Sequence, residues 1–233
     1  MAIFASDISV VIPAINEQDN IVGAVESALS AGAVEVWVAD GGSTDNTIEY
    51  ACQAGALVCC GDPGRAVQQN NGAQHATKMI LCFLHADNRL EPAALQQVAS
   101  YFSEDQTNSW SCFYQNIEAT GIGYSLLQWG NAWRARWSGR VYGDQAITIT
   151  RELFEVIGGF PEVDLMEDVL LSKILRHQGL RPCVLAGPVK ISARRWMKKG
   201  IVRQTLSNWW LLVQLRLGTK PNQLAKHYRR HDG

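Results

Sequence analysis

The chain lacks a long hydrophobic run and lacks cysteine pairs at metal-binding spacing. No stretch approaches the ~18 apolar residues that a membrane-spanning helix requires, and residues 1–7 lack the basic-then-apolar order of a secretion signal. The six cysteines lie mostly in apolar segments and show no Cys-x-x-Cys spacing, so we expect neither a zinc site nor a disulfide framework. These absences predict a soluble or peripheral protein of the reducing cytoplasm.

Acidic residues are almost absent from the end of the chain. Residues 1–168 hold 21 of the 22 Asp and Glu and seven of the 21 Lys and Arg, a charge of −14. Residues 169–233 hold one acid and 14 Lys and Arg, a charge of +13. A basic end favours an anionic partner, either a diphosphate, a lipid headgroup surface or nucleic acid. Alternatively, the two oppositely charged parts attract each other.

Segments of strand length alternate with segments of helical period over the first half of the chain. Strands are predicted at 8–12, 34–39, 57–59 and 79–84, and helices at 19–31, 45–54, 65–77 and 92–103. This order predicts an α/β fold with a doubly wound, mostly parallel sheet that helices cover on both faces. Further on, strands are predicted at 110–117, 146–150, 183–185 and 189–192, and helices at 122–138, from about 151, at 169–178, and twice in the last 35 residues.

Acidic residues stand where three of the predicted strands end. Glu17 follows the first strand, Asp40 the second and Asp87 the fourth. Ligands of open α/β sheets bind at the carboxyl ends of the strands. The segment Pro13–Glu17 contains no Gly-x-Gly-x-x-Gly, which excludes nicotinamide, flavin and most methyl-donor sites of the Rossmann type.

These acids have a structural and a functional interpretation. Asp40 suits a hydrogen bond to a ribose or a base N–H, or it caps the turn that Gly41-Gly42 begins. Asp87 suits Mg²⁺ or Mn²⁺ that also binds diphosphate oxygens. His85 is either a second metal ligand or a hydrogen-bonded packing residue.

Three polar clusters lie outside these strand ends. In Glu167-Asp168, Asp168 suits a general base, and both residues suit helix capping. Arg194-Arg195-Trp196 suits a phosphate and a sugar, or a solvated helix face. The segment from Gly64-Arg65 to Gly72 contains Asn70 and suits a phosphate or a base at a helix start.

The order of these motifs along residues 8–200 resembles the family 2 glycosyltransferases of the GT-A fold. The succession is Val11–Glu17, Asp40–Thr47, Phe83–Asp87, Glu167-Asp168 and Arg195-Trp196. Within that family, the segments Gly143-Asp144-Gln145 and Gly159-Phe160-Pro161 are similar to a small bacterial single-domain subgroup.

The resemblance implies a role for each matching position. In the family's pattern, Pro13 and Glu17 hold the nucleotide, and Asp40 contacts its base. Asp87 binds the metal and thereby the sugar diphosphate, and Asp168 is the catalytic base of an inverting displacement. We also assign Arg65 and Asn70 to the donor. The residues assigned to the acceptor or the diphosphate are Asp144, Glu167, Arg195 and Trp196.

These roles predict an inverting glycosyltransferase that moves a sugar from a UDP- or GDP-sugar to an acceptor hydroxyl, assisted by Mn²⁺ or Mg²⁺. The alternatives are a non-catalytic nucleotide-sugar-binding protein and a sugar nucleotidyltransferase. We place the glycosyltransferase domain at 1–217, with a nucleotide-binding half at 1–105 and an acceptor half at 106–217, and a helical tail at 218–233.

The basic C-terminal part, with Trp209-Trp210-Leu211-Leu212, predicts peripheral contact with the inner face of a membrane next to a lipid acceptor. The alternatives are a small-molecule acceptor and tryptophans that pack on the acidic body. No nucleic-acid motif is present, so no nucleic-acid partner is expected.

Overall fold

One sheet runs through the molecule. The computed structural model describes residues 2–105 and 107–230, apart from the side chains of residues 195, 198, 199 and 226–230. Its strands within these ranges are β1 (Ile8–Ala14), β2 (Glu35–Asp40), β3 (Leu57–Cys60), β4 (Ile80–Phe83), β5 (Asn88–Leu90), β6 (Trp110–Ile117), β7 (Ile147–Thr150) and β8 (Cys183–Ile191). Their order is β3-β2-β1-β4-β7-β6-β8-β5, and four of the seven pairings are parallel. The predicted mixed α/β architecture is confirmed.

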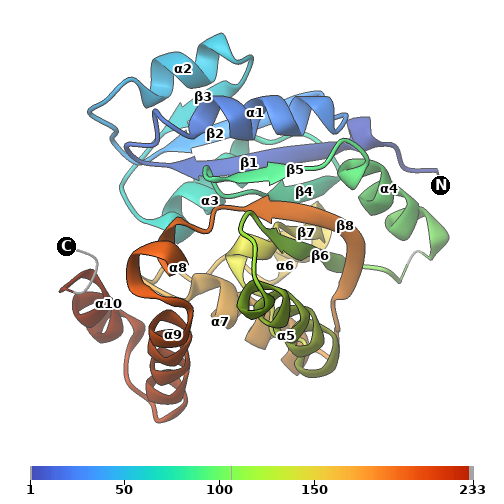
Figure 1. The fold of residues 1–233 in the computed structure, drawn as a ribbon. Coiled ribbons are helices and arrows are strands. Elements are labelled where there is room, and N and C mark those ends of the chain that lie inside the picture. The colour runs from blue at the N-terminus through green and yellow to red at the C-terminus, as the bar shows by residue number, and fades with distance from the viewer. Residues whose placement is uncertain (1, 106, 231–233) are drawn as a thin grey trace.

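The helices surround this sheet. They are α1 (Ile21–Ser30), α2 (Thr47–Gln53), α3 (Arg65–His75), α4 (Ala94–Glu104), α5 (Ile122–Ser138), α6 (Arg151–Val156), α7 (Glu167–His177), α8 (Arg194–Lys199), α9 (Ile201–Arg216) and α10 (Pro221–Arg230). Two 3₁₀ turns, η1 (Ala5–Asp7) and η2 (Gly143–Gln145), precede β1 and β7. Figure 1 shows α1 and α2 at one end of the molecule and α5, α8, α9 and α10 at the other. None of the described helices has the length and apolar composition to cross a membrane.

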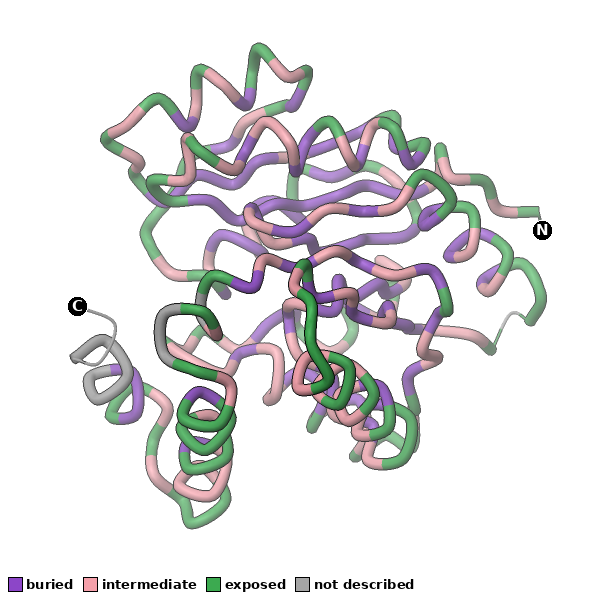
Figure 2. Tube along the Cα trace, viewed as in Figure 1, coloured by how far each residue is buried: buried purple, intermediate pink, exposed green. Residues whose placement is uncertain are grey.

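Alternate residues of the central strands enter two separate cores. Val10 and Ile12 of β1 belong to one buried cluster, and Val11 belongs to the other. In β4, Ile80 and Cys82 likewise belong to the first cluster, whereas Leu81 and Phe83 belong to the second. The burial of both faces explains why these strands read as continuous apolar runs rather than as alternating ones. Figure 2 shows the buried tube concentrated in this central part of the sheet.

The sequence and the structure differ at one side of the sheet. The strands predicted at 183–185 and 189–192 are one strand, β8, whose pairing with β6 shifts register between Phe113 and Tyr114. The short strand β5 was not predicted, because Asn88-Arg89-Leu90 has no apolar run and is a strand only through its pairing with β8. Helix α7 begins at Glu167, two residues earlier than predicted, so the acidic pair lies in its first turn.

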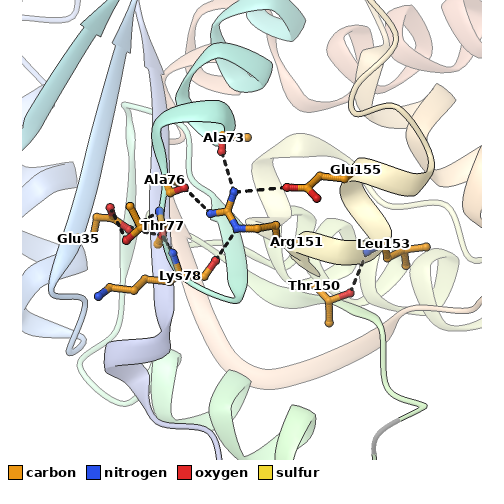
Figure 3. A network of polar contacts seen from close by, with 10 residues as sticks. Glu35, Ala73, Ala76, Thr77, Lys78, Thr150, Arg151, Leu153 and Glu155 are labelled. Atoms are coloured by element: carbon orange, nitrogen blue, oxygen red, sulfur yellow. Dashed lines mark hydrogen bonds and ion pairs between the residues drawn. The ribbon is translucent and has the colours of Figure 1, made fainter.

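A polar network ties the start of α6, directly after β7, to the end of α3. Arg151 donates hydrogen bonds to the carbonyl oxygens of Ala73 and Ala76, at 3.2 and 2.6 Å, and to that of Lys78 at 2.9 Å (Figure 3). A cation at the last carbonyls of a helix is favourable, because these groups carry the negative end of its dipole. The network anchors α3, whose first residue, Arg65, faces the candidate site at the other end of the helix.

Candidate functional site

The loops after β1 and β2 are bonded to each other. These strands are parallel with Ala14 opposite Asp40, so their loops leave the sheet at the same place. The Asn16 side chain accepts a hydrogen bond from the Thr44 main chain at 2.8 Å. The main-chain N–H of Glu17 donates to Thr47 Oγ1 at 2.8 Å. The predicted donor residue Glu17 therefore sits on a loop whose main chain is already held.

Asp40 builds the turn that follows β2. Its residue is 1% exposed, and its carboxylate accepts hydrogen bonds from the main chain of Gly42 at 2.8 Å and of Ser43 at 2.9 Å. The Ser43 hydroxyl donates to the other carboxylate oxygen. The structure thus shows the capping interpretation of Asp40, in which the carboxylate shapes the loop.

Gln68 on α3 bonds the carboxyl-terminal ends of β1 and β2. Its side-chain Nε2 donates to the carbonyl oxygens of Ala14 and Ala39, at 2.6 and 2.9 Å. Gly72, one helical turn further on, leaves the space that Val11 of β1 occupies, and a Cβ there would clash with it. Within the Gly64–Gly72 segment, Gln68 and Gly72 therefore hold α3 against the sheet.

A pocket opens where β4 ends and β7 begins. Phe83 and Ile147 are opposite each other in these antiparallel strands, so the segment after β4 meets the η2 turn before β7. The pocket is lined by Arg65, His85, Asp87, Asn88, Tyr142, Asp144, Leu165, Met166, Asp168, Val169, Ile191, Ser192, Trp196, Asn208, Leu211 and Leu212. It therefore brings together three acids, Asp87, Asp144 and Asp168, that are far apart in the sequence.

Asp168 is held by main-chain N–H groups. Its Oδ2 accepts from Gly143 at 2.6 Å and its Oδ1 accepts from Val169 at 2.7 Å. A Cβ at Gly143 would lie 2.6 Å from His85 Nε2 and 3.4 Å from Asp168 Oδ2. The turn can approach His85 and Asp168 this closely because residue 143 has no side chain. The structure thus places His85 against the turn that carries Asp144.

Glu167 is turned away from the pocket and pairs with Arg65. Its side chain is 3% exposed, and its Oε1 lies 3.3 Å from Arg65 Nη1. Burial raises the pKa of Glu167, whereas the guanidinium of Arg65 opposes this shift and the charge of Asp168 adds to it. Met166, the residue immediately before Glu167, has a φ of 68°. This left-handed conformation marks the point where the loop ends and α7 begins. The pair orients Arg65, which lines the pocket.

Two assigned residues are placed differently. Both ends of the Asn70 amide bond the main chain of Phe160 at 2.9 Å, and Asn70 does not line this pocket. Trp196 of α8 does line it, while the side chain of its neighbour Arg195 lies outside the described part of the chain. The predicted donor residues Pro13, Glu17 and Asp40 lie at the strand ends beside the pocket rather than in its wall.

Several residues that line the pocket were not predicted as site residues from the sequence. Asn88 donates to the carbonyl oxygen of Asp144 at 3.1 Å and so joins β5 to the η2 turn. Asn208, Leu211 and Leu212 reach the pocket from α9. In Trp209-Trp210-Leu211-Leu212, Leu211 is buried while both tryptophans are exposed. No motif marks these residues, and only the inward side of α9 distinguishes them.

The comparison with known proteins decides the family. The sequence profile of glycosyl transferase family 2 matches residues 9–160, about two thirds of the chain. This chain belongs to glycosyl transferase family 2. Membership of this family supports glycosyl transfer as the activity. No curated protein sequence matches it closely enough to count as a relative.

Solved structures show the same fold as this glycosyltransferase. A crystal structure of S. aureus TarS matches with a TM-score of 0.63 and 18% identity, over 80% of this chain and 60% of that one. The mannosyltransferase PcManGT from Pyrobaculum calidifontis, in complex with GDP-Man and Mn²⁺, matches with a TM-score of 0.59 and 21% identity, over 78% of this chain and 55% of that one. The GT-A fold is confirmed. The glycosyltransferase spans little more than half the length of these proteins.

A divalent cation fits the residues of the pocket only with help from a bound diphosphate. Within residues 2–105 and 107–230, no three His, Cys, Asp or Glu side chains form a group that would hold a metal ion. Asp87 presents one carboxylate to the pocket. Mg²⁺ and similar hard ions commonly bind one or two carboxylates together with phosphate oxygens and water. One carboxylate is therefore enough as the protein's ligand when a diphosphate supplies further oxygens.

Proposed function

We propose that this glycosyltransferase moves a sugar from a nucleoside-diphosphate sugar, of the UDP or GDP type, to an acceptor hydroxyl with inversion at the anomeric carbon. The proposal depends on one observation above all. Asp87 follows β4, Asp168 is the second residue of α7, and both line the same pocket. One acid would serve the donor and the other the acceptor.

The donor would extend along the carboxyl ends of the parallel strands. Its nucleoside would lie near Glu17 and the loop that Asp40 shapes, with Pro13 acting through the main chain. Its diphosphate would lie at Asp87 and Arg65, within reach of the α8 segment with Arg195 and Trp196. A divalent cation bound with Asp87 would neutralise charge on the departing diphosphate. Asp144 would complete the acceptor side, and Glu167 would act at the diphosphate by orienting Arg65.

Asp168 would act as the general base. The acceptor oxygen attacks the anomeric carbon, the bond from that carbon to the diphosphate oxygen breaks, and Asp168 takes the hydroxyl proton. The N–H groups of Gly143 and Val169 fix the carboxylate in one orientation, which is what a positioned base requires. His85 would support the same turn by packing on Gly143, and a metal bond from its ring remains the alternative.

Two substitutions test this division of roles. Asp168→Asn should retain the affinity for the nucleotide sugar, measured by calorimetry, while release of nucleoside diphosphate falls by about 10²- to 10⁴-fold. Asp87→Ala should remove the Mn²⁺-dependent rise in melting temperature that the nucleotide sugar causes. Asp164→Asn is the matched control, because Asp164 is exposed in the loop before α7. Equal losses of donor affinity in the Asp87 and Asp168 variants would contradict the proposal.

A further inference from the structure

Two helices of this protein carry apolar stripes that nothing in the described chain covers. The α5 stripe consists of Ile122, Leu126, Trp129, Trp133 and Trp137, which are 54–82% exposed. The α9 stripe consists of Val202, Leu206 and Trp209, which are 59–71% exposed. At 3.6 residues per turn, each stripe occupies about 100° of its helix surface or less. Single exposed apolar residues are ordinary, but two such stripes mark an interaction surface.

The two helices are neighbours. A Cβ at Gly123, in the first turn of α5, would lie 2.9 Å from Ile201 Cδ1 in the first turn of α9. Figure 1 shows both helices at the same end of the molecule, and Figure 2 shows exposed tube along each. We call the two stripes together the α5–α9 face.

The stripes are not misplaced core. The opposite side of α5 buries Ala132 and Ala135, and that of α9 buries Gln204 and Leu211. Asn208, Leu211 and Leu212 on this inner side line the pocket. Each helix therefore already has a packed side, and its stripe is a second apolar side.

The charge around the α5–α9 face has one sign. Neither helix contains Asp or Glu, and together they contain Arg134, Arg136, Arg203 and Arg216. A groove beside them is lined by Arg140, Val169, Leu170, Lys173, Arg176, His177, Leu212, Leu215 and Arg216, with no acid among these residues. The ion pairs found within the described residues include none of the cations of this groove.

Among the described residues, the groove is lined by cations and by no acid. Partial burial of Arg140 lowers its pKa, and the neighbouring guanidinium groups of Arg216 and Arg176 lower it further. Like charges that lower each other's pKa repel, and an anion between or near them reduces this repulsion. An anionic ligand would therefore relieve a repulsion already present in the fold.

We propose that the α5–α9 face docks this enzyme on an anionic lipid bilayer, with its tryptophans in the headgroup region and the groove cations on lipid phosphates. Exposed apolar stripes, tryptophan and flanking arginine are the features of helices that lie in the plane of a membrane surface. A second copy of the chain fits less well. A twofold interface places the same patch on both sides, so the cations would face each other.

Docking would also place the pocket at the membrane. Val169 and Leu212 line both the cationic groove and the pocket with Asp168. An acceptor hydroxyl carried by a bilayer lipid would then approach from the α9 side. This last step rests on the proposed function, whereas the docking itself does not.

Vesicle binding tests the docking directly. The full chain should co-sediment with vesicles of phosphatidylcholine and phosphatidylglycerol at low salt, and binding should fall at physiological salt because attraction is screened beyond about 8 Å. It should bind pure phosphatidylcholine vesicles less. Lipids brominated on their acyl chains should quench tryptophan fluorescence. The protein is used without donor or acceptor, so the outcome is independent of the catalytic proposal.

Matched variants separate docking from other causes of binding. Trp133→Ser with Trp209→Ser should lower vesicle binding at least tenfold, while Phe4→Ser, equally exposed near the N-terminus, should leave it unchanged. Arg216→Gln should lower binding about fivefold, and Lys78→Gln, which removes one charge at the N-terminal end of β4, should not. An unchanged melting temperature, measured without ligand, shows that each variant is folded.

Three outcomes would overturn the proposal. The first is no preference for anionic vesicles at low salt. The second is equal binding by the double tryptophan variant and the unsubstituted protein. The third is a dimer in sedimentation velocity, without lipid, that the same tryptophan substitutions dissociate, since the face would then be an interface between copies.

Discussion

The loops after β1 and β2 differ from the α5–α9 face in whether their side chains have partners within the protein. In the loops, Asn16, Asp40, Ser43 and Thr47 bond one another and the main chain, so the polar groups have partners before any ligand binds. On α5 and α9, by contrast, the outward apolar side chains have no cover within the described chain. The polar groups of the first region are hydrogen bonded within the protein, whereas the apolar side chains of the second region would be covered only by a binding partner.

This difference bears on how each region recognises its ligand. A loop that is already hydrogen bonded loses little conformational freedom on binding, so it can present main-chain groups to a donor at small entropic cost. Exposed tryptophan and arginine instead suit an extended and variable surface, because they need no fixed geometry. Substitutions inside the first region should therefore perturb the fold, and matched ones on the second should not.

The largest contrast should come from adding a methyl group to a glycine of the pocket and to one of α5. Gly143→Ala places a Cβ 2.6 Å from His85 Nε2, so the η2 turn or the His85 ring must shift, and this turn carries the N–H that holds Asp168. We expect the rate of nucleoside diphosphate release to fall about 100-fold and the free energy of unfolding to fall by about 1–3 kcal/mol.

Gly130→Ala is the control on α5, since a Cβ there meets nothing within 4 Å. It should leave the rate unchanged and raise the free energy of unfolding by about 0.4–1 kcal/mol, because alanine favours the helix. Steady-state kinetics and urea denaturation measure both effects. A Gly143→Ala enzyme of normal rate would show that this turn does not position Asp168.

A smaller contrast should come from removing one hydroxyl in each region. Thr47→Val keeps the shape of a buried residue but leaves the N–H of Glu17 without its acceptor. We expect a loss of about 1–3 kcal/mol in unfolding free energy and a weaker affinity for the nucleotide sugar. Thr205→Val, on the exposed side of α9, should change stability by less than about 0.5 kcal/mol. Equal effects of the two would remove the distinction between the regions.

The smallest contrast should appear in the pH dependence of two buried carboxyl groups. For Glu35, burial raises the pKa, but hydrogen bonds from Ser9, Thr77 and Trp37 outweigh it, and the net pKa is lowered. Its stabilising contribution is present above its unfolded pKa and is lost as the pH falls through the folded value. For Glu167 the net pKa is raised, so its contribution is full below the unfolded pKa and is lost as the pH rises through the folded value.

The unfolding free energies of Glu35→Gln and Glu167→Gln, measured from about pH 4 to about pH 8, test these signs. Relative to its Gln variant, the unsubstituted protein should gain stability with rising pH at Glu35 and lose it at Glu167. Slopes of the same sign would show that Arg65 compensates the burial of Glu167 fully.

The sequence predicted α5 with its observed bounds and placed β1, β2 and β4 within two residues of theirs, because each is a contiguous run with its own start and stop signals. Its errors fell on elements without such signals. β5 has no apolar run, and β8 passes through Gly187-Pro188, which reads as a break although the register shift with β6 absorbs it. Burial and pairing partners decide such segments, and neither is a local property.

The candidate site divides in the same way. Asp87 and Asp168 were found because each stands at a recognisable position, after a buried strand and before an apolar helix. The Gly143 contact with Asp168, the Arg65–Glu167 pair across 102 residues, and the reach of Asn208 from α9 were not found. Asn70 was assigned to the donor, yet its amide bonds Phe160, 90 residues away. Long-range partners of this kind carry no spacing signal.

The sequence by itself determined the family, the strands and helices of the first half, and which residues share a helix face, because these depend on local periodicity and on a motif order that one chain contains. The tertiary structure alone decided what lies against each face. The tryptophans of α5 recur at every fourth residue, but only the fold shows that no described element covers them and that the packed side of α9 closes the pocket. A period in the sequence specifies the direction of a side chain, and the surrounding structure specifies what it meets.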